Sequence, residues 1–146
     1  VLLDGAPMGS ELHEPSVTAC VSVVAKMPPV RSWVNEQMRK VARDGPIVVD
    51  GRDMGTAVFP RAQLKVFLVA EAAVRARRRL LQRLERAPRE DEVVAETEEL
   101  NRRDDRDAEQ TQRARDAVVI DTTRLAQDEQ VERIVTMAER AIAGRA

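Results

Sequence analysis

An apolar run leads directly into a charged loop in Ile47-Val48-Val49-Asp50-Gly51-Arg52-Asp53-Met54-Gly55-Thr56. Consecutive β-branched residues are typical of a buried strand in a parallel sheet. Gly51 and Gly55 let the backbone turn sharply where it leaves the sheet, so that Arg52 and Asp53 face the crevice in which α/β proteins bind ligands. Because Arg offers a rigid fork of donors to phosphate and Asp accepts from amino or hydroxyl groups, the pair indicates a nucleotide monophosphate. The alternative is a loop in which Arg52 and Asp53 pair only with each other.

Helix-like and strand-like segments alternate along the chain on both sides of this loop. Pro15 suits the first turn of a helix, and Asp44-Gly45-Pro46 ends the helix that precedes the strand at 47–49. This alternation predicts parallel strands joined by right-handed crossovers, and therefore an α/β fold. Apolar periodicity places the helices within 15–24, 30–41, 73–84, 93–100 and 131–142, and the strands at 47–49, 66–69 and 118–120.

Length and composition fit one compact domain of 146 residues with an aliphatic core. The aromatic residues are only Trp33, Phe59 and Phe67, and the net charge is −1. These features exclude a stacking platform for single-stranded nucleic acid and a general polyanion binder. No apolar run reaches membrane-spanning length, and the start has no signal-peptide pattern. We therefore expect a cytoplasmic protein with neither nucleic acid nor membrane as a partner.

The single cysteine and the single histidine cannot build a zinc site, and we expect no metal site in this chain. Cys20 lies on the apolar face of the first expected helix, which favours a small core residue over a nucleophile. His13 is isolated and carries no assignment. Asp50 ends the strand at 47–49, where it could hold magnesium through water or serve only as a cap.

A loop that cradles the phosphates of a nucleoside triphosphate is absent from the sequence. The Walker A pattern needs a glycine immediately before its lysine. The segment Gly5-Ala6-Pro7-Met8-Gly9-Ser10 is faintly similar, but Glu11 stands where a cation is needed and would repel a triphosphate, so we expect a turn there. The lysines Lys26, Lys40 and Lys65 follow Ala25, Arg39 and Leu64.

Charge concentrates in two further segments. Arginines crowd the helix within 73–84 and its end, where a solvated face is the favoured interpretation and no catalysis is assigned. The run Arg102–Asp107 packs opposite charges tightly, as a salt-bridged helix end would. The crowded arginines are Arg75, Arg77, Arg78, Arg79, Arg83 and Arg86.

The segment from Asp50 to Thr56, followed by Val58-Phe59-Pro60, closely resembles the signature of bacterial cytidylate kinases, which move the terminal phosphate of ATP onto CMP or dCMP. The resemblance implies a nucleoside monophosphate kinase fold of the P-loop NTPase type, truncated here to its C-terminal two-thirds, with the Walker strand missing. Further matches are Ser22-Val23-Val24-Ala25, Pro28, Val30-Arg31, Lys65-Val66-Phe67-Leu68, Arg103-Asp104-Asp105-Arg106-Asp107 and Asp116-Ala117-Val118-Val119-Ile120-Asp121-Thr122-Thr123. On this basis 1–146 is one partial kinase domain, with a monophosphate-binding insert at 1–46, core strands and helix at 47–86, a lid at 87–116 and a C-terminal strand and helix at 117–146.

The resemblance also implies roles for single residues. Ser22, Arg31 and Asp53 match positions that contact the cytosine ring. A carboxylate accepts from the exocyclic amine of cytosine while Arg or Ser donates to its carbonyl and ring nitrogen, so the three can reject uracil by leaving a partner unpaired.

Residues in and beyond the loop match positions that handle phosphate and sugar. Arg52 matches an arginine on the CMP phosphate, Arg103 a lid arginine near the transferring phosphoryl group, and Asp107 the carboxylate on the sugar. Arginines suit a transfer in which the protein mainly positions groups and balances charge.

Two departures from the family pattern affect the expected site. Gln110 stands where a second lid arginine is usual, in a loop that is several residues shorter, and Arg113 or Arg115 could substitute for it. Leu12-His13-Glu14 stands where Ile-Arg-Thr is common, which removes one charged contact near the CMP site.

The missing Walker strand has a geometric consequence. In the family's strand order 2-3-1-4-5 it lies between the strands of Val48 and Val66, which would otherwise stand about 10 Å apart, twice the normal spacing of roughly 4.8 Å. Unpaired buried amides cost about 1 to 3 kcal/mol each against a total stability of about 5 to 15 kcal/mol. We therefore expect the chain alone to fold poorly, close its sheet differently, or recruit a missing piece.

Three functions follow as hypotheses. The first is the C-terminal part of a cytidylate kinase that uses ATP with Mg²⁺ to phosphorylate CMP or dCMP, inactive as this chain alone, in a family whose members generally act alone. An in-frame Gly-x-x-x-x-Gly-Lys-Ser/Thr upstream would support it. The second is a degenerate or split protein that binds CMP without phosphorylating it. The third is a non-enzymatic interaction module.

Overall fold

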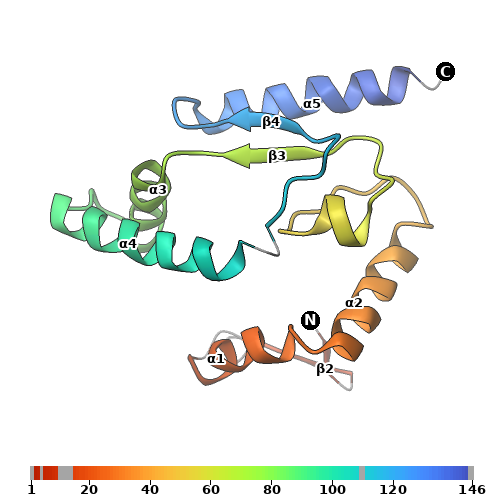
Figure 1. Cartoon of the computed structure of the whole chain (residues 1–146), viewed down its shortest axis with the longest axis horizontal. Coiled ribbons are helices and arrows are strands. Elements are labelled where there is room, and N and C mark those ends of the chain that lie inside the picture. The colour runs from red at the N-terminus through yellow and green to blue at the C-terminus, as the bar shows by residue number, and fades with distance from the viewer. Residues whose placement is uncertain (1, 4, 10–14, 109–110, 145–146) are drawn as a thin grey trace. The chain divides into compact units, whose positions relative to one another are not determined.

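The computed structural model describes residues 2–3, 5–9, 15–108 and 111–144. It divides into two compact units, Val1–Val48 and Val49–Ala146, and each is described by itself. Their elements are numbered in chain order, and Figure 1 labels those for which there is room. No helix in the described part of the chain has the length and apolarity that crossing a bilayer requires.

The unit Val1–Val48 contains a short hairpin and two helices. Strand β1 (Leu2–Leu3) pairs antiparallel with β2 (Ala6–Pro7). Gly5 has a φ of +84° in the connecting turn, a conformation that glycine adopts without steric cost. Helices α1 (Pro15–Val24) and α2 (Pro28–Val41) follow, and each begins at a proline, whose missing N–H is tolerated in a first turn. Both predicted helices are confirmed, and part of the turn predicted after Gly5 is the strand β2.

None of the residues of this unit whose side chains are described is buried. Cys20 is exposed, so the prediction that it is a small core residue is wrong. Val17, Val21 and Val24 are exposed on the same helix. An apolar helical stripe predicts a face that needs cover, and within this unit the described residues leave that face open.

The unit Val49–Ala146 has the predicted α/β character. Strand β3 (Val66–Val69) pairs in parallel with β4 (Val118–Asp121), in the register Val66 with Val118. The order of elements is η2 (Met54–Val58, a π-helix), β3, α3 (Ala72–Leu84), α4 (Glu90–Asp107), β4 and α5 (Gln127–Ala143). The predicted strands at 66–69 and 118–120 and all three predicted helices are confirmed.

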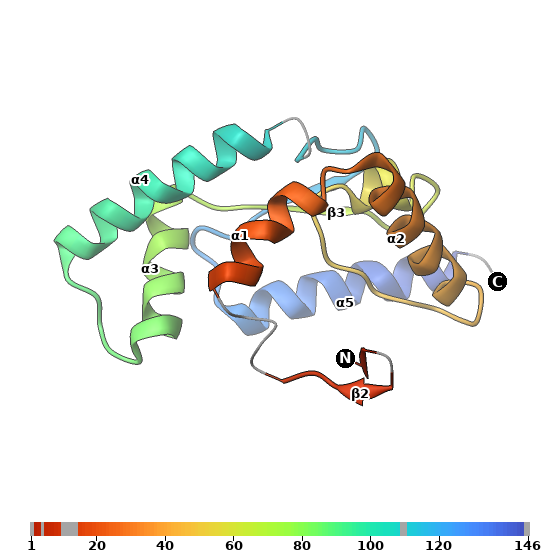
Figure 2. The same ribbon diagram turned by 90° about the horizontal axis from the view of Figure 1, so that it is seen from below.

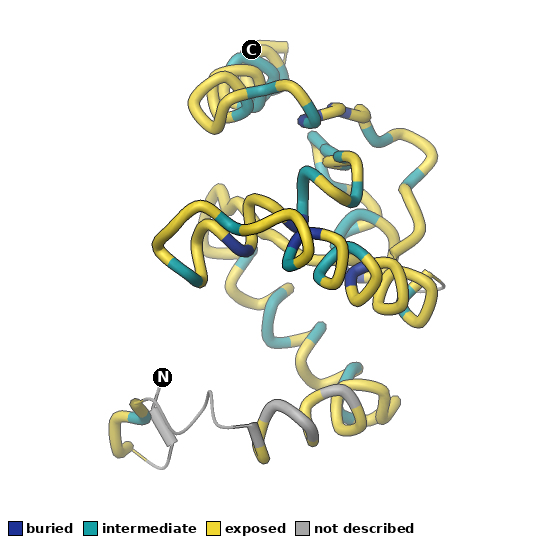
Figure 3. The backbone as a smooth tube through the Cα atoms, turned by 90° about the vertical axis from the view of Figure 1, so that its left-hand side faces the viewer, coloured by how far each residue is buried: buried dark blue, intermediate teal, exposed yellow. Residues whose placement is uncertain are grey.

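The core of this unit lies between α3 and α4, which pack side by side (Figure 2). Ala76 and Leu80 of α3 meet Val93 and Leu100 of α4, and Leu84 packs against them. Val58, Ile120 and Thr122 are also buried. Figure 3 shows that buried positions are few and that most of the described chain is exposed.

The strand predicted at 47–49 does not form. Residues 47–50 have no strand pairing, and Val48 is 99% exposed. A strand exists only where a neighbour satisfies its backbone donors and acceptors, and the apolar pattern does not supply that neighbour. Among the described residues, β3 pairs only with β4.

Candidate functional site

The charged loop leads into a tight π-helical turn. Asp53 precedes this turn, and its carbonyl oxygen accepts the backbone N–H of Ala57 at 2.8 Å and, at longer range, those of Thr56 at 3.2 Å and Val58 at 3.3 Å. Single π turns are rare and are frequent at functional sites. Val58 is 1% exposed, so the end of the turn is fixed in the interior while Arg52 is exposed just before its start.

The two glycines of the loop have a different role from the one predicted. Among the described glycines only Gly5 has a positive φ, so Gly51 and Gly55 do not turn the backbone through the left-handed region. They permit close contact instead. A Cβ on Gly51 would lie 2.9 Å from Cε of Met54, and a Cβ on Gly55 would lie 3.2 Å from Cδ of Lys65.

Two predicted site residues converge on the carboxylate of a third. Nη1 of Arg52 donates to Oδ2 of Asp107, at the end of α4. Nε of Arg103 lies 3.7 Å from the same oxygen. The Arg52 and Arg103 side chains are 40% and 48% exposed, whereas that of Asp107 is 21% exposed. The alternative that Arg52 and Asp53 pair only with each other is therefore wrong, because Arg52 pairs across the unit with Asp107.

The predicted cytosine-contacting residues are distributed over both units. Ser22 and Arg31 belong to α1 and α2 of the unit Val1–Val48, and the Ser22 side chain lies outside the described part. Asp53 is half-buried in the unit Val49–Ala146. Their convergence on one base therefore stays a prediction.

Sequence reasoning missed a nearly buried lysine beneath the loop. The Lys65 side chain is 7% exposed. Its Nζ donates to the carbonyl oxygen of Pro60 at 2.6 Å and lies 2.8 Å from both carboxylate oxygens of Asp116. Hydrogen bonding from Lys65 holds the pKa of the Asp116 carboxyl below its usual range. The sequence feature that could have drawn attention to Lys65 is its position directly before the apolar strand at 66–69.

The arginine-rich helix α3 is tied to α4. Its arginines are largely exposed, as predicted, but five of the six in and just after this helix also pair with carboxylates of α4, and a solvated face is an incomplete description. Glu96, with a side chain only 10% exposed, receives both Arg79 and Arg83. Arg78 instead bonds to Thr122 and Leu125 after β4. The remaining pairs are Arg75 with Asp104, Arg77 with Glu90 and Arg86 with Glu92.

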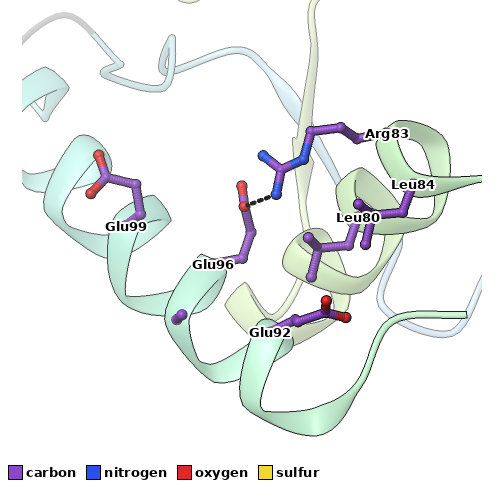
Figure 4. A pocket seen from close by; sticks show the side chains of 7 residues that line it. Leu80, Arg83, Leu84, Glu92, Glu96 and Glu99 are labelled. Atoms are coloured by element: carbon purple, nitrogen blue, oxygen red, sulfur yellow. Dashed lines mark hydrogen bonds and ion pairs between the residues drawn. The ribbon is translucent and has the colours of Figure 1, made fainter.

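An open pocket of about 300 Å³ lies beside this contact (Figure 4). Leu80, Arg83 and Leu84 of α3 face Glu92, Glu96 and Glu99 of α4 across it. None of the predicted site residues lines this pocket. The salt-bridged helix end predicted for 102–107 is confirmed, since Arg102 and Arg106 both pair with Glu99.

Two of the predicted departures from the family pattern fall on residues that the structure does not describe. Gln110 lies outside the described residues, as does the segment Leu12-His13-Glu14. Arg113 and Arg115 are exposed in the connection to β4. Asp50 is exposed, and its expected position at a strand end is lost with that strand. Among the described residues, no group of three or more His, Cys, Asp or Glu is placed to hold a metal ion.

The parallel pair of β3 and β4 and the alternation of strands with helices define an α/β protein, and the family match below gives its fold as that of the nucleoside monophosphate kinases. The family model for cytidylate kinase matches residues 1–140, and the chain belongs to this family. It is 44% identical over 140 residues to the cytidylate kinase of Thermus thermophilus, covering 96% of this chain and 64% of that protein. It is 42% identical over 147 residues to that of Geobacillus kaustophilus, covering 97% and 65%. The chain thus spans slightly less than two thirds of these relatives.

Proposed function

We propose that the protein containing this chain transfers the terminal phosphoryl group of ATP to CMP or dCMP, giving ADP and CDP or dCDP. Membership of the cytidylate kinase family supports this activity. The observation that carries it is the convergence of Arg52 and Arg103 on Asp107, because two guanidinium groups beside one carboxylate make a site suited to a phosphate next to a sugar. In this proposal residues 1–46 are the monophosphate-binding insert and 87–116 the lid.

The proposed chemistry is an in-line displacement. An oxygen of the CMP phosphate attacks the terminal phosphorus of ATP, the new P–O bond forms, and the bond to the bridging oxygen breaks as ADP leaves. Arg52 holds the CMP phosphate and Arg103 balances the charge that develops on the transferring group. Asp107 accepts a hydrogen bond from the sugar. The arginines act by position and charge, since this transfer needs little covalent participation from the protein.

Base selection is assigned to Ser22, Arg31 and Asp53. Cytosine presents a donor amine beside acceptor atoms, and a carboxylate with Ser and Arg complements that pattern. Uracil would place a carbonyl against the Asp53 carboxylate and leave both unpaired, which disfavours it.

Magnesium is expected with ATP in this family. When bound, Mg²⁺ neutralises charge on the transferring phosphates. Mg²⁺ in such sites is held mainly by the nucleotide phosphates and by water, with one or two carboxylates, and we assign no residue of this chain to it. The sequence also has no Gly-Lys pair, and we assign the triphosphate to residues outside it.

The experiment is CMP titration by calorimetry, together with a coupled assay of ADP release, on the full-length gene product. Arg52→Gln removes the proposed phosphate contact, and we expect CMP affinity to fall by about tenfold to a hundredfold. Arg77→Gln is the matched control, because Arg77 pairs with Glu90 on the exposed side of α3 and has no proposed ligand contact. It should leave CMP affinity unchanged.

Each alternative has its own outcome. CMP binding without ADP release would identify the degenerate or split binding protein. Absence of CMP binding by the wild-type protein would overturn the proposal in favour of an interaction module. The same conclusion would follow if Arg52→Gln and Arg31→Gln both bound CMP with the affinity of the wild type.

A further inference from the structure

Two sets of contacts, called the outer and inner ties here, hold residues in and just after the charged loop near the two ends of the connection between α4 and β4. The outer tie is the ion pair between Arg52 and Asp107, whose side chains are 40% and 21% exposed. The inner tie is Lys65, which reaches Pro60 at the end of the loop and Asp116 just before β4. The connection between α4 and β4 is thus fixed near both of its ends.

The inner tie is closely packed as well as hydrogen-bonded. Cδ of Lys65 would lie 3.2 Å from a Cβ on Gly55, and Cβ of Ala114 would lie 3.5 Å from it. The aliphatic part of Lys65 therefore lies against the backbone of the π-helical turn, next to the same segment that carries Asp116. A lysine can bury its stem in this way while its ammonium donates to three oxygens.

The two ties differ in how easily they exchange partners. Arg52 must redirect donors from Asp107 to bind a phosphate, and partly exposed ion pairs of this kind are individually weak. Lys65 is 7% exposed, so removing its partners would leave a desolvated ammonium, which is costly. Ligand binding can therefore open the outer tie while the inner tie persists.

We propose that Lys65 is a positioning residue for CMP binding: bonded to Pro60 and Asp116, it keeps the loop of Arg52 and Asp53 in register with the end of α4 while a phosphate replaces Asp107 on Arg52. This inference rests on the proposed function. Lys65 touches no substrate in this role and acts through the backbone of the loop. The Asp116 carboxyl is ionised at neutral pH, and the hydrogen bond from Lys65 lowers its pKa further.

The test compares Lys65→Met, Lys65→Arg and Asp116→Asn in the full-length protein. Methionine keeps the stem against Gly55 and removes the charge, and Asp116 is 65% exposed, so its unpaired carboxylate can be solvated. We expect Lys65→Met to weaken CMP binding and raise the KM for CMP by about tenfold, with the KM for ATP unchanged. Asp116→Asn should have a smaller effect in the same direction, and Lys65→Arg should recover part of the affinity.

Leu80→Ala is the control for a loss of stability alone. Leu80 is 2% exposed in the contact of α3 with α4, so this variant lowers Tm without touching either tie. It should bind CMP like the wild type at a temperature where it is folded. Lys65→Met that lowers Tm but binds CMP like Leu80→Ala would overturn the positioning role, provided that the wild type binds CMP. Failure of the wild type to bind CMP would overturn the proposed function itself.

Discussion

The guanidinium groups of Arg52 and Arg103 share the carboxylate of Asp107. Side-chain chemistry in the loop indicated Arg52, and the family resemblance indicated all three. Lys65 was not assigned, although it is the most deeply placed charged group near them. The difference is physical. A guanidinium beside a glycine in a loop indicates ligand chemistry, whereas a lysine before an apolar strand carries no sign of the carboxylate that the fold brings to it from residue 116.

Gly55→Ala tests the close packing beneath the loop. The added methyl carbon would lie 3.2 Å from Cδ of Lys65, and the Lys65 side chain is held at its other end by Pro60 and Asp116. We expect a loss of about 1 to 3 kcal/mol in the free energy of unfolding, measured by urea denaturation. Gly45→Ala is the control, because a Cβ there meets no atom within 4 Å. Equal effects of the two substitutions would contradict this packing.

At the scale of elements, the helices were predictable because an apolar stripe at helical spacing needs only the chain itself to form hydrogen bonds. The strands were predictable only where a neighbour exists. Val66–Val69 and Val118–Asp121 supply each other with partners, whereas 47–49 has an equally apolar sequence and no pairing. Pairing partners are a property of the assembled sheet, so the local pattern could not distinguish these segments.

The contact of α3 with α4 predicts a dependence of stability on acid. A hydrogen bond from Arg86, with a second from the backbone N–H of Arg89, lowers the pKa of Glu92 from 4.5 to about 2. A carboxyl whose pKa is lower in the folded state stabilises it above the unfolded pKa, and this contribution is lost as the pH falls through the folded value. We expect Tm to decrease between pH 4.5 and about 2.

Glu92→Gln should have a lower Tm at neutral pH and a smaller decrease of Tm in acid, measured by circular dichroism. Glu98→Gln is the control, since the Glu98 carboxylate lies 3.9 Å from Arg102 on the exposed side of α4. Its Tm should follow the wild-type pH profile. A Glu92→Gln profile parallel to that of the wild type would show that Glu92 does not contribute to acid sensitivity.

At the scale of the whole molecule, the boundary between the units Val1–Val48 and Val49–Ala146 falls within the unpaired segment 47–50. The residues proposed to bind CMP fall on both sides of this boundary, with Arg31 in the first unit and Arg52 in the second. Apolar periodicity predicted the helices α1 to α5 and the strands β3 and β4, but it carries no information on which contacts are dense enough to hold a unit together.

Limited digestion of this chain with elastase tests that boundary. Proteases need extended, unpaired backbone, and Val48 is 99% exposed in a segment without strand pairing. We expect the first cut within 47–50, identified by mass spectrometry of the two products. Val119 is the internal control, because it is 41% exposed but paired in β4 and should resist cleavage. An initial cut inside α4 would contradict the proposed boundary.

The two-strand sheet of β3 and β4 has a consequence for how the chain behaves in concentrated solution. Leu68 is 51% exposed and Val118 is 45% exposed, so the sheet presents apolar side chains as well as outer backbone edges that no other described strand covers. Such edges are templates for any extended peptide, including a second molecule. Capture between molecules is bimolecular and competes with refolding within one molecule, so recovery of this chain from denaturant should improve as it is diluted.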